Sequence, residues 1–181
     1  MRLVLLLLLA LSTIFANQTS ELLKRYENAE YKQICTDYSS NIKNYRKSEK
    51  FVLLYSFSCL EAGYIDSLAV PITMLKYSKD ARDNASYFAT ILLQKKILYN
   101  ALIDDVDISS LRLPTTTYIL SKVFDLYVKN KNNPVDGVYR LDDTQDADTF
   151  YKLYISSRSH IKKMVIEVYK NKKLENRYIY W

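Results

Sequence analysis

The stretch from Ser48 to Tyr77 constrains the fold of this chain most, because it predicts two helices joined by a defined turn. Ser48 can accept a hydrogen bond from a free backbone N–H of the first helical turn, and the carboxylate of Glu49 meets the positive end of that helix. Gly63 can adopt the left-handed conformation that ends a helix without steric cost. We therefore expect an antiparallel helical hairpin with its turn at Gly63.

The first of these helices has one mostly apolar face, which needs a packing partner. Residues at three- and four-residue steps share a face of a helix. In this helix they are Val52, Tyr55, Ser56, Cys59 and Leu60. The second helix is expected to begin at Asp66 or Ser67, which leaves Pro71 in or just beyond its first turn, where a missing N–H costs little.

The composition favours a mainly helical protein. Of the 181 residues, 49% are hydrophobic and only 2 are Gly and 3 are Pro, unlike a disordered chain or a turn-rich β-sandwich. Helical patterns continue from residue 80 to 104 and from Thr115 to Asn130. The 17 Tyr suit half-covered helix faces and partner surfaces, because each combines a large ring with a polar tip.

The pattern changes after a stretch rich in turn formers, residues 131 to 137. Three later segments are β-branched, aromatic and partly alternating, and they begin at Thr149, Met164 and Leu174. They predict a hairpin plus one more strand, a sheet too small to stand alone that should pack on the helices. We expect a helical domain over residues 17–131 and a small basic β-containing region over residues 132–181.

Residues 1–16 predict a secretory signal peptide. Arg2 is followed by an unbroken apolar run from Leu3 to Leu11 and by the small residue Ala16, which places cleavage before Asn17. An uncleaved membrane anchor is the alternative, although the apolar run is short for a bilayer. We therefore expect an exported protein, periplasmic or extracellular after cleavage.

The two cysteines fit a pair of antiparallel helices. Cys35 and Cys59 are equally far from Lys47, which lies at the expected turn between a helix ending near Tyr45 and the helix that starts at Ser48. The two side chains would then lie level with each other, and a disulfide would form in an oxidising compartment. Two buried free thiols are the alternative.

A repeat links the hairpin to the segment before it. At an offset of 34 residues, four positions of the earlier segment match four of the later one: Ala29, Tyr31, Ile34 and Tyr38 fall on Gly63, Ile65, Leu68 and Ile72. Over about residues 20–105 the chain resembles the tetratricopeptide-repeat (TPR) family, which has two antiparallel helices per unit. An irregular helical bundle is the alternative architecture.

The resemblance implies a mainly α fold of TPR-like antiparallel helical hairpins, here with a small C-terminal antiparallel β element. Together with the export signal and the absence of catalytic motifs in the sequence, it leads us to expect a non-enzymatic adaptor or scaffold that binds a protein partner, within a cell-envelope assembly such as a secretion or motility machine. The partner-facing residues would be Lys50, Leu53, Phe57, Leu60 and Glu61. Ordinary core packing is the alternative role for these side chains.

Positive charge is concentrated at the C-terminal end. Residues 157–181 hold seven Lys or Arg against two Glu, a net charge of +5, whereas residues 17–156 are neutral. This region could therefore hold anionic wall polymer or membrane lipid. The cations expected to do so are Lys162, Lys163, Lys170, Lys172, Lys173 and Arg177. No nucleic acid is expected for an exported chain, and a charged face that only prevents aggregation is the alternative.

No catalytic residue, cofactor or metal site is expected. The chain has one His and lacks a Gly-rich phosphate loop, a Cys/His cluster and a Gly-x-Ser-x-Gly motif. Glu61 and Asp66 could form the acid pair of an envelope hydrolase, the least favoured hypothesis. A run of acidic residues invites a calcium site but lacks the Gly and distal Glu of a calcium loop, so a solvated loop is favoured. The run is Asp142, Asp143, Asp146 and Asp148.

Overall fold

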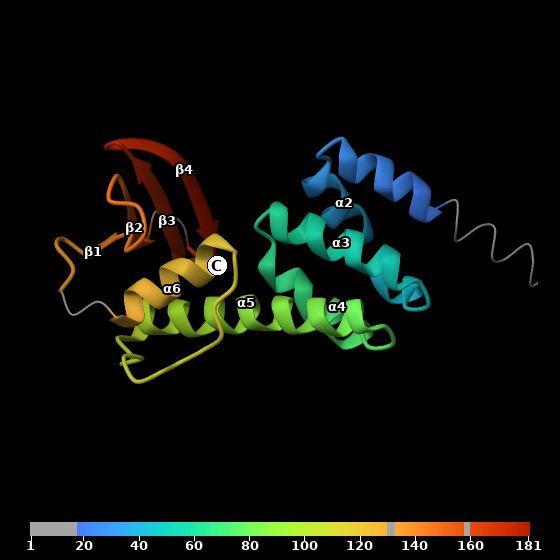
Figure 1. The fold of residues 1–181 in the computed structure, drawn as a ribbon, viewed down its shortest axis with the longest axis horizontal. Coiled ribbons are helices and arrows are strands. Elements are labelled where there is room, and N and C mark those ends of the chain that lie inside the picture. The colour runs from blue at the N-terminus through green and yellow to red at the C-terminus, as the bar shows by residue number, and fades with distance from the viewer. Residues whose placement is uncertain (1–17, 130–132, 158–159) are drawn as a thin grey trace, which may run out of the picture. The chain divides into compact units, whose positions relative to one another are not determined.

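The computed structural model describes residues 18–129, 133–157 and 160–181, so the expected signal peptide lies outside the described residues. Contacts divide the chain into two compact units, unit 1 ending at Ser86 and unit 2 beginning at Tyr87 (Figure 1). The long helix α5, Lys79–Asp104, crosses this division. The sequence placed a boundary after residue 131, whereas the contacts group helix α6, Ile119–Lys129, with the sheet.

Unit 1 is helical, and its elements follow one another closely. A helix covers residues 18–27. The elements that follow it are α2 (Tyr31–Tyr38), the 3-10 helix η1 (Ile42–Tyr45), α3 (Glu49–Glu61), the 3-10 helix η2 (Ile65–Leu68), α4 (Ala69–Met74) and the start of α5. Helix α3 contacts α2, η2 and α4, so it is the central element of this unit.

Both ends of α3 confirm the sequence analysis. The Ser48 hydroxyl accepts a hydrogen bond from the backbone N–H of Phe51 at 3.4 Å, as an N-cap residue does. Gly63 has φ +76° just beyond the end of the helix. The expected apolar face is confirmed as well, because all five of its residues are buried: Val52, Tyr55, Ser56, Cys59 and Leu60.

The second half of the hairpin differs from the single helix expected up to Tyr77. It is split into η2 and α4, and α4 ends at Met74. Pro71 has no N–H to donate to the carbonyl of Ser67, so the α-helical hydrogen-bond pattern cannot extend back through η2. This pair of short elements follows α3 but is not the regular four-turn helix that the sequence suggested.

The segment before α3 also has a break where the 34-residue offset places one. Ala29 has φ +57°, and it matches Gly63, which has a similar positive φ. A helix precedes each of the two residues and a helical segment follows it. The later part differs from the expected helix to Tyr45, because α2 already ends at Tyr38.

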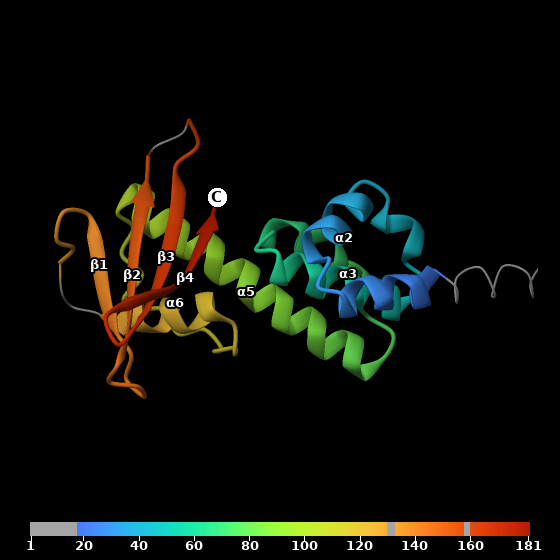
Figure 2. The ribbon, with the colours of Figure 1, turned by 90° about the horizontal axis from the view of Figure 1, so that it is seen from above.

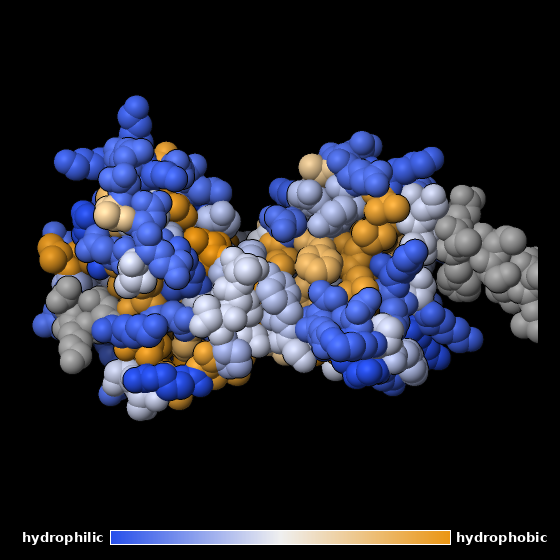
Figure 3. Space-filling view, in the orientation of Figure 1, coloured by the Kyte–Doolittle hydropathy of each residue, from blue (hydrophilic) through white to orange (hydrophobic). Residues whose placement is uncertain are grey.

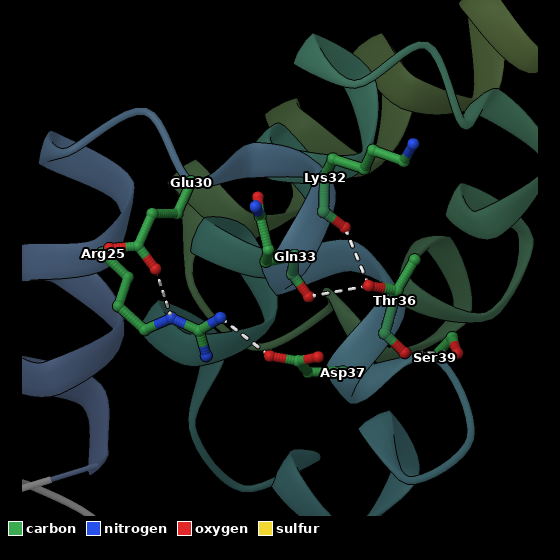
Figure 4. Close-up of polar contacts among 7 residues, drawn as sticks. All are labelled: Arg25, Glu30, Lys32, Gln33, Thr36, Asp37 and Ser39. Atoms are coloured by element: carbon green, nitrogen blue, oxygen red, sulfur yellow. Dashed lines mark hydrogen bonds and ion pairs between the residues drawn. The ribbon is translucent and has the colours of Figure 1, made fainter.

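Arg25 connects the first helical segment to α2. Its guanidinium Nε donates to Glu30 at 3.0 Å and its Nη2 donates to Asp37 at 2.7 Å (Figure 4). The hydrogen bonds from Arg25 to Asp37 and Glu30 raise the pKa of the guanidinium. Its positive charge is thus paired with two carboxylates. A guanidinium fork held by two carboxylates fixes the angle between two elements better than one contact could.

The expected disulfide is confirmed. Cys35 of α2 and Cys59 of α3 are bonded, with their Cα atoms 4.9 Å apart. Both side chains are buried. The bond therefore joins α2 to α3 inside the core of unit 1.

Unit 2 contains a four-stranded antiparallel sheet in the order β1-β2-β3-β4 (Figure 2). Its strands are β1 (Val138–Asp142), β2 (Thr149–Ser156), β3 (Lys163–Lys170) and β4 (Lys173–Tyr180). The last three were expected. They pair with the strand next to them in sequence, so each connection is a simple hairpin.

The β3–β4 hairpin closes through Asn171 and Lys172, which both have positive φ, as a tight hairpin turn requires. Strand β1 was not expected. It follows Asp136 and Gly137, which also have positive φ, and it is only five residues long. Its charged residues weaken the apolar pattern, so the sequence showed a turn there but not the strand.

An ion pair between a partly exposed lysine and a buried aspartate connects α6 to the sheet. Lys122 of α6 pairs with Asp143, which follows β1 and also accepts a hydrogen bond from the Tyr151 hydroxyl of β2 at 2.7 Å. Asp143 is only 8% exposed, so the solvated loop expected there is wrong for this residue. Burial favours the protonated acid, but the bonds from Lys122, Gln145 and Tyr151 outweigh it and lower the pKa of Asp143.

Replacing Cys35 and Cys59 by alanine together is expected to destabilise unit 1. The bond spans 24 residues of sequence, and closing a loop of that size contributes about 3 kcal/mol through the unfolded chain. Urea unfolding followed by circular dichroism measures the loss, and reduced wild-type protein should unfold like the double variant. Equal midpoints for oxidised and reduced protein would show that the bond contributes nothing.

Candidate functional site

The two faces of the sheet differ in character. One face is buried, and its residues are Leu141, Tyr151, Leu153, Met164, Ile166 and Tyr180. The opposite face, called the outer face below, carries the alternating residues of the same strands. Its polar and aromatic members include Arg140, Asp142, Phe150, Lys152, Tyr154, Lys163, Glu167, Tyr169 and Arg177. The outer face is the candidate site, because its side chains form one connected set.

Four charged residues form a row across the outer face. Arg140 of β1 lies opposite Lys152 of β2, Lys152 lies opposite Glu167 of β3, and Glu167 lies opposite Arg177 of β4. Three cations and one carboxylate give this row a net charge of +2. Like charges directly opposite each other, as in Arg140 and Lys152, normally destabilise a sheet.

Glu167 is the centre of the row, and it is only 5% exposed. Arg177 donates to its Oε1 through Nη2 at 2.6 Å and through Nε at 2.9 Å. The Tyr154 hydroxyl donates to Oε1 at 3.1 Å and the Tyr169 hydroxyl donates to Oε2 at 3.0 Å. Burial favours the protonated acid, but the hydrogen bonds from Arg177, Tyr169 and Tyr154 outweigh it and lower the pKa of Glu167. The carboxylate is therefore charged at neutral pH and holds two phenol rings in place.

The aromatic rings of the outer face position its cations. The Arg140 guanidinium lies 3.9 Å from the centre of the Phe150 ring, and that ring stacks on Tyr169 at 4.8 Å. The Lys152 ammonium lies 4.8 Å from the Tyr169 ring centre. A ring attracts a cation through its quadrupole without cancelling the charge. Arg140 and Lys152 are thus fixed side by side on this stack, although Arg140 also forms an exposed ion pair with Asp142 at 3.0 Å.

A hollow of about 640 Å³ lies on the outer face beside β1. Its lining holds two cations and three carboxylates, and the lining residues are Asn133, Val135, Asp136, Val138, Arg140, Asp142, Lys152, Tyr154 and Glu167. This volume is in the range of sites for small ligands or one segment of a polymer. Figure 3 shows one face of the molecule, on which hydrophilic residues lie among smaller hydrophobic patches.

The six cations expected to bind an anionic surface lie at three separate places in unit 2. Lys163 is on the outer face, 5.2 Å from the Trp181 ring centre, and Arg177 is bound to Glu167. Lys172 and Lys173 are exposed at the β3–β4 hairpin, and Lys170 lies beside them, 3.8 Å from Asp146. Lys162 is exposed before β3, and its carbonyl accepts a hydrogen bond from Tyr99 at 2.7 Å.

Sequence reasoning missed Arg140, Phe150 and Lys152 as site residues. Arg140 belongs to the unexpected strand β1, and the position of Lys152 opposite it depends on strand register. The alternation of Phe150, Lys152 and Tyr154 along β2 was the available signal, because alternate residues of a strand share a face.

The expected partner-facing residues of α3 have different environments. Lys50 and Glu61 are exposed, and Leu53 and Phe57 are half-buried. Leu60 is only 2% exposed, so it belongs to the core and is not available to a partner. Of the five expected residues, Leu60 is thus a core residue, and the other four, which form a stripe along α3, are exposed or half-buried.

Within residues 18–129, 133–157 and 160–181, no group of three or more His, Cys, Asp or Glu could hold a metal ion. Among the helices in these same ranges, none has both the length and the apolar character needed to cross a membrane.

Comparison of the chain with family models, with curated proteins and with solved structures found no match in any of the three. The resemblance to TPR proteins therefore stays a prediction. The candidate site is therefore defined by the geometry of the outer face of the sheet.

Glu167→Gln is expected to lower the stability of unit 2 by about 1–3 kcal/mol at pH 7, because hydrogen bonds to a charged group are lost. The folded-state pKa of Glu167 lies below its ordinary value of 4.5, so this contribution is complete above pH 4.5. It is lost as the pH falls through the folded-state value. Thermal unfolding of both proteins between pH 7 and pH 3 measures the effect.

The matched control for this change is Glu175→Gln, at an exposed glutamate of β4, which should leave stability unchanged. A difference between wild type and Glu167→Gln that does not shrink below pH 4.5 would contradict the role of the carboxylate charge.

Proposed function

We propose that this protein is a non-enzymatic binding protein that holds an anionic polymer on the outer face of its sheet. The observation that supports this function is the placement of Arg140 and Lys152 opposite each other, each over the face of an aromatic ring. Two adjacent cations on one rigid surface create a positive potential that attracts a polyanion.

The cost of this arrangement supports a binding role. Arg140 and Lys152 repel each other, and a sheet that needed only stability would place opposite charges there. The ring stack of Phe150 and Tyr169 holds the two cations through their charge, and of the two Arg140 also pairs with Asp142 at the exposed edge. Glu167 in turn accepts a hydrogen bond from the Tyr169 hydroxyl and so fixes that ring. Because the rings already position the Arg140 and Lys152 side chains, these side chains lose little conformational freedom when a ligand binds.

The pair of ring-held cations, rather than the hollow as a whole, favours a polysaccharide with carboxylate or phosphate groups, because Asp136 and Asp142 also line the hollow. The cations would pair with the anionic groups, and the Tyr154 and Asn133 side chains that line the same hollow could hydrogen-bond to sugar hydroxyls. A wall polymer fits an exported protein, and export is part of the proposal. The Cys35–Cys59 bond supports it, since disulfides persist in oxidising compartments.

The state of Glu167 supports a binding role over catalysis. A general acid needs a raised pKa, whereas the pKa of Glu167 is lowered and its oxygens accept bonds from three side chains. Its place in the site is that of a positioning residue for Tyr154, Tyr169 and Arg177.

A second candidate function is a protein-binding adaptor in a cell-envelope assembly, such as a secretion or motility machine. The observation that favours it is the stripe of α3 that carries Lys50, Leu53 and Glu61, which is less buried than the rest of that helix. Two exposed charges flank half-buried apolar side chains on it, a composition that suits a polar-rimmed protein interface.

Replacing Arg140 and Lys152 by glutamine together is expected to weaken binding of polygalacturonate, a carboxylated polysaccharide, by at least about tenfold, equivalent to about 1.4 kcal/mol. Isothermal titration calorimetry at low salt measures the affinity, and binding should weaken as salt is added. Neutral dextran should not bind.

The control for this pair removes the same number of charges from exposed positions of unit 1, by Lys24→Gln with Lys32→Gln. It should bind polygalacturonate like the wild type. Equal affinities for wild type and the Arg140 and Lys152 variant would contradict the proposed site and leave the adaptor function as the better candidate.

A further inference from the structure

Unit 1 contains a second group of cations, around a hollow of about 490 Å³. The residues that line this basic hollow are Arg46, Lys47, Thr73, Met74, Lys76 and Tyr77. Three of the six are cations, and none is acidic. They come from two segments, the connection between η1 and α3 and the end of α4 with the residues that follow it.

Glu49 holds these two segments together. Its carboxylate accepts three backbone hydrogen bonds, from Lys76 at 3.2 Å, Tyr77 at 2.7 Å and Ser78 at 3.0 Å. Because Glu49 is in the first turn of α3, two residues after Lys47, it fixes one wall of the hollow relative to the other. The hydrogen bonds to Tyr77, Ser78 and Lys76 also lower the pKa of Glu49 despite the opposing effect of burial, so its charge persists at neutral pH.

Arg82 supports the same wall from α5. Its guanidinium donates to the carbonyl of Lys76 at 3.2 Å and to the carbonyl of Tyr77 at 2.7 Å. The backbone of this wall is therefore held through its N–H groups by Glu49 and through its carbonyls by Arg82. A fixed backbone lets the hollow present its side chains with little ordering cost on binding.

The three cations of the hollow form no ion pair within the part of the chain that the structure describes. Among the residues that the structure describes, no hydrogen-bond acceptor or carboxylate is paired with the side-chain nitrogens of Arg46, Lys47 or Lys76. Lys76 only lies 5.3 Å from the centre of its neighbour's ring, that of Tyr77. Arg25 shows the contrast, since two carboxylates satisfy it. The charges of the hollow are thus not used to cap a helix or to form an ion pair.

The local charge is positive although the sequence around it is neutral overall. Arg46, Lys47 and Lys76 line the hollow and no acid does, while the oxygens of the nearby Glu49 point to backbone N–H groups. The lining itself therefore carries a net charge of +3. Like charges gathered around one concave surface raise its positive potential and attract multivalent anions.

We propose that the basic hollow binds a phosphate group carried by an organic molecule. Arg46 can donate two parallel hydrogen bonds to phosphate oxygens, and Lys47 and Lys76 can add point charges. Tyr77, which is 69% exposed, and Met74 provide an apolar wall for the organic part of the ligand. This site is in the other unit from the outer face of the sheet, so it goes beyond the function proposed above.

Titration of the ¹⁵N-labelled full chain with inorganic phosphate tests the site. The backbone amides of Arg46, Lys47, Lys76 and Tyr77 should shift together and saturate. Arg46→Gln with Lys47→Gln should weaken phosphate binding at least tenfold. The control pair, Lys24→Gln with Lys32→Gln, removes the same charge from exposed positions and should stay within twofold of the wild type. Unchanged thermal unfolding shows that each variant is folded.

Two further arms identify the source of the phosphate. Glycerol phosphate that binds, with phosphatidylglycerol vesicles that do not, supports a soluble phosphoester. Phosphatidylglycerol vesicles that bind, with phosphatidylcholine vesicles that do not, support a lipid headgroup. The proposal is overturned if none of the probes binds, or if the control pair loses as much affinity as the hollow variant. Arg140→Gln with Lys152→Gln should leave phosphate binding unchanged, which separates this site from the outer face.

Discussion

The carboxylate of Glu167 is the group on which the outer face of the sheet depends. It is buried, and three side chains from β2, β3 and β4 meet at its two oxygens. An ionised carboxylate can remain in such a place only if hydrogen bonds replace the water it has lost. Tyr154, Tyr169 and Arg177 supply those bonds, and in doing so their side chains become fixed.

The position of one ring then determines the positions of the cations. Glu167 holds the Tyr169 hydroxyl, Tyr169 stacks on Phe150, and the two rings carry Lys152 and Arg140. A buried negative charge thus organises a positive surface. Unit 1 has a similar device, because Glu49 uses its carboxylate to hold the backbone segment that contributes Lys76 and Tyr77 to the basic hollow. In both units the acid is used for structure while several cations beside it remain open to an anion.

Sequence reasoning was most successful where a local pattern determines the outcome. Ser48 and Gly63 mark the ends of α3 through their own chemistry, and the spacing of Cys35 and Cys59 around a turn led to the correct disulfide. It failed where the outcome depends on distant partners. The burial of Asp143 follows from Lys122, which belongs to α6, and from Tyr151, which belongs to the neighbouring strand β2.

The candidate site was difficult to predict for the same reason. Total charge pointed to the C-terminal residues, and Lys163 and Arg177 do lie on the outer face. The decisive pair, Arg140 and Lys152, is created by strand register, which a single sequence does not determine for a weak strand such as β1. A sum of charges also hid the basic hollow of unit 1, because acidic residues elsewhere in residues 17–156 cancel its cations.

The most direct test of the central claim maps polygalacturonate onto the ¹⁵N-labelled wild-type protein by NMR. If the outer face is the binding surface, the amides that shift will be those of β1, β2 and β3 around Arg140, Lys152 and Tyr169. Shifts limited to the hairpin turn at Asn171 and Lys172, or to unit 1, would contradict the claim, as would the absence of any shift.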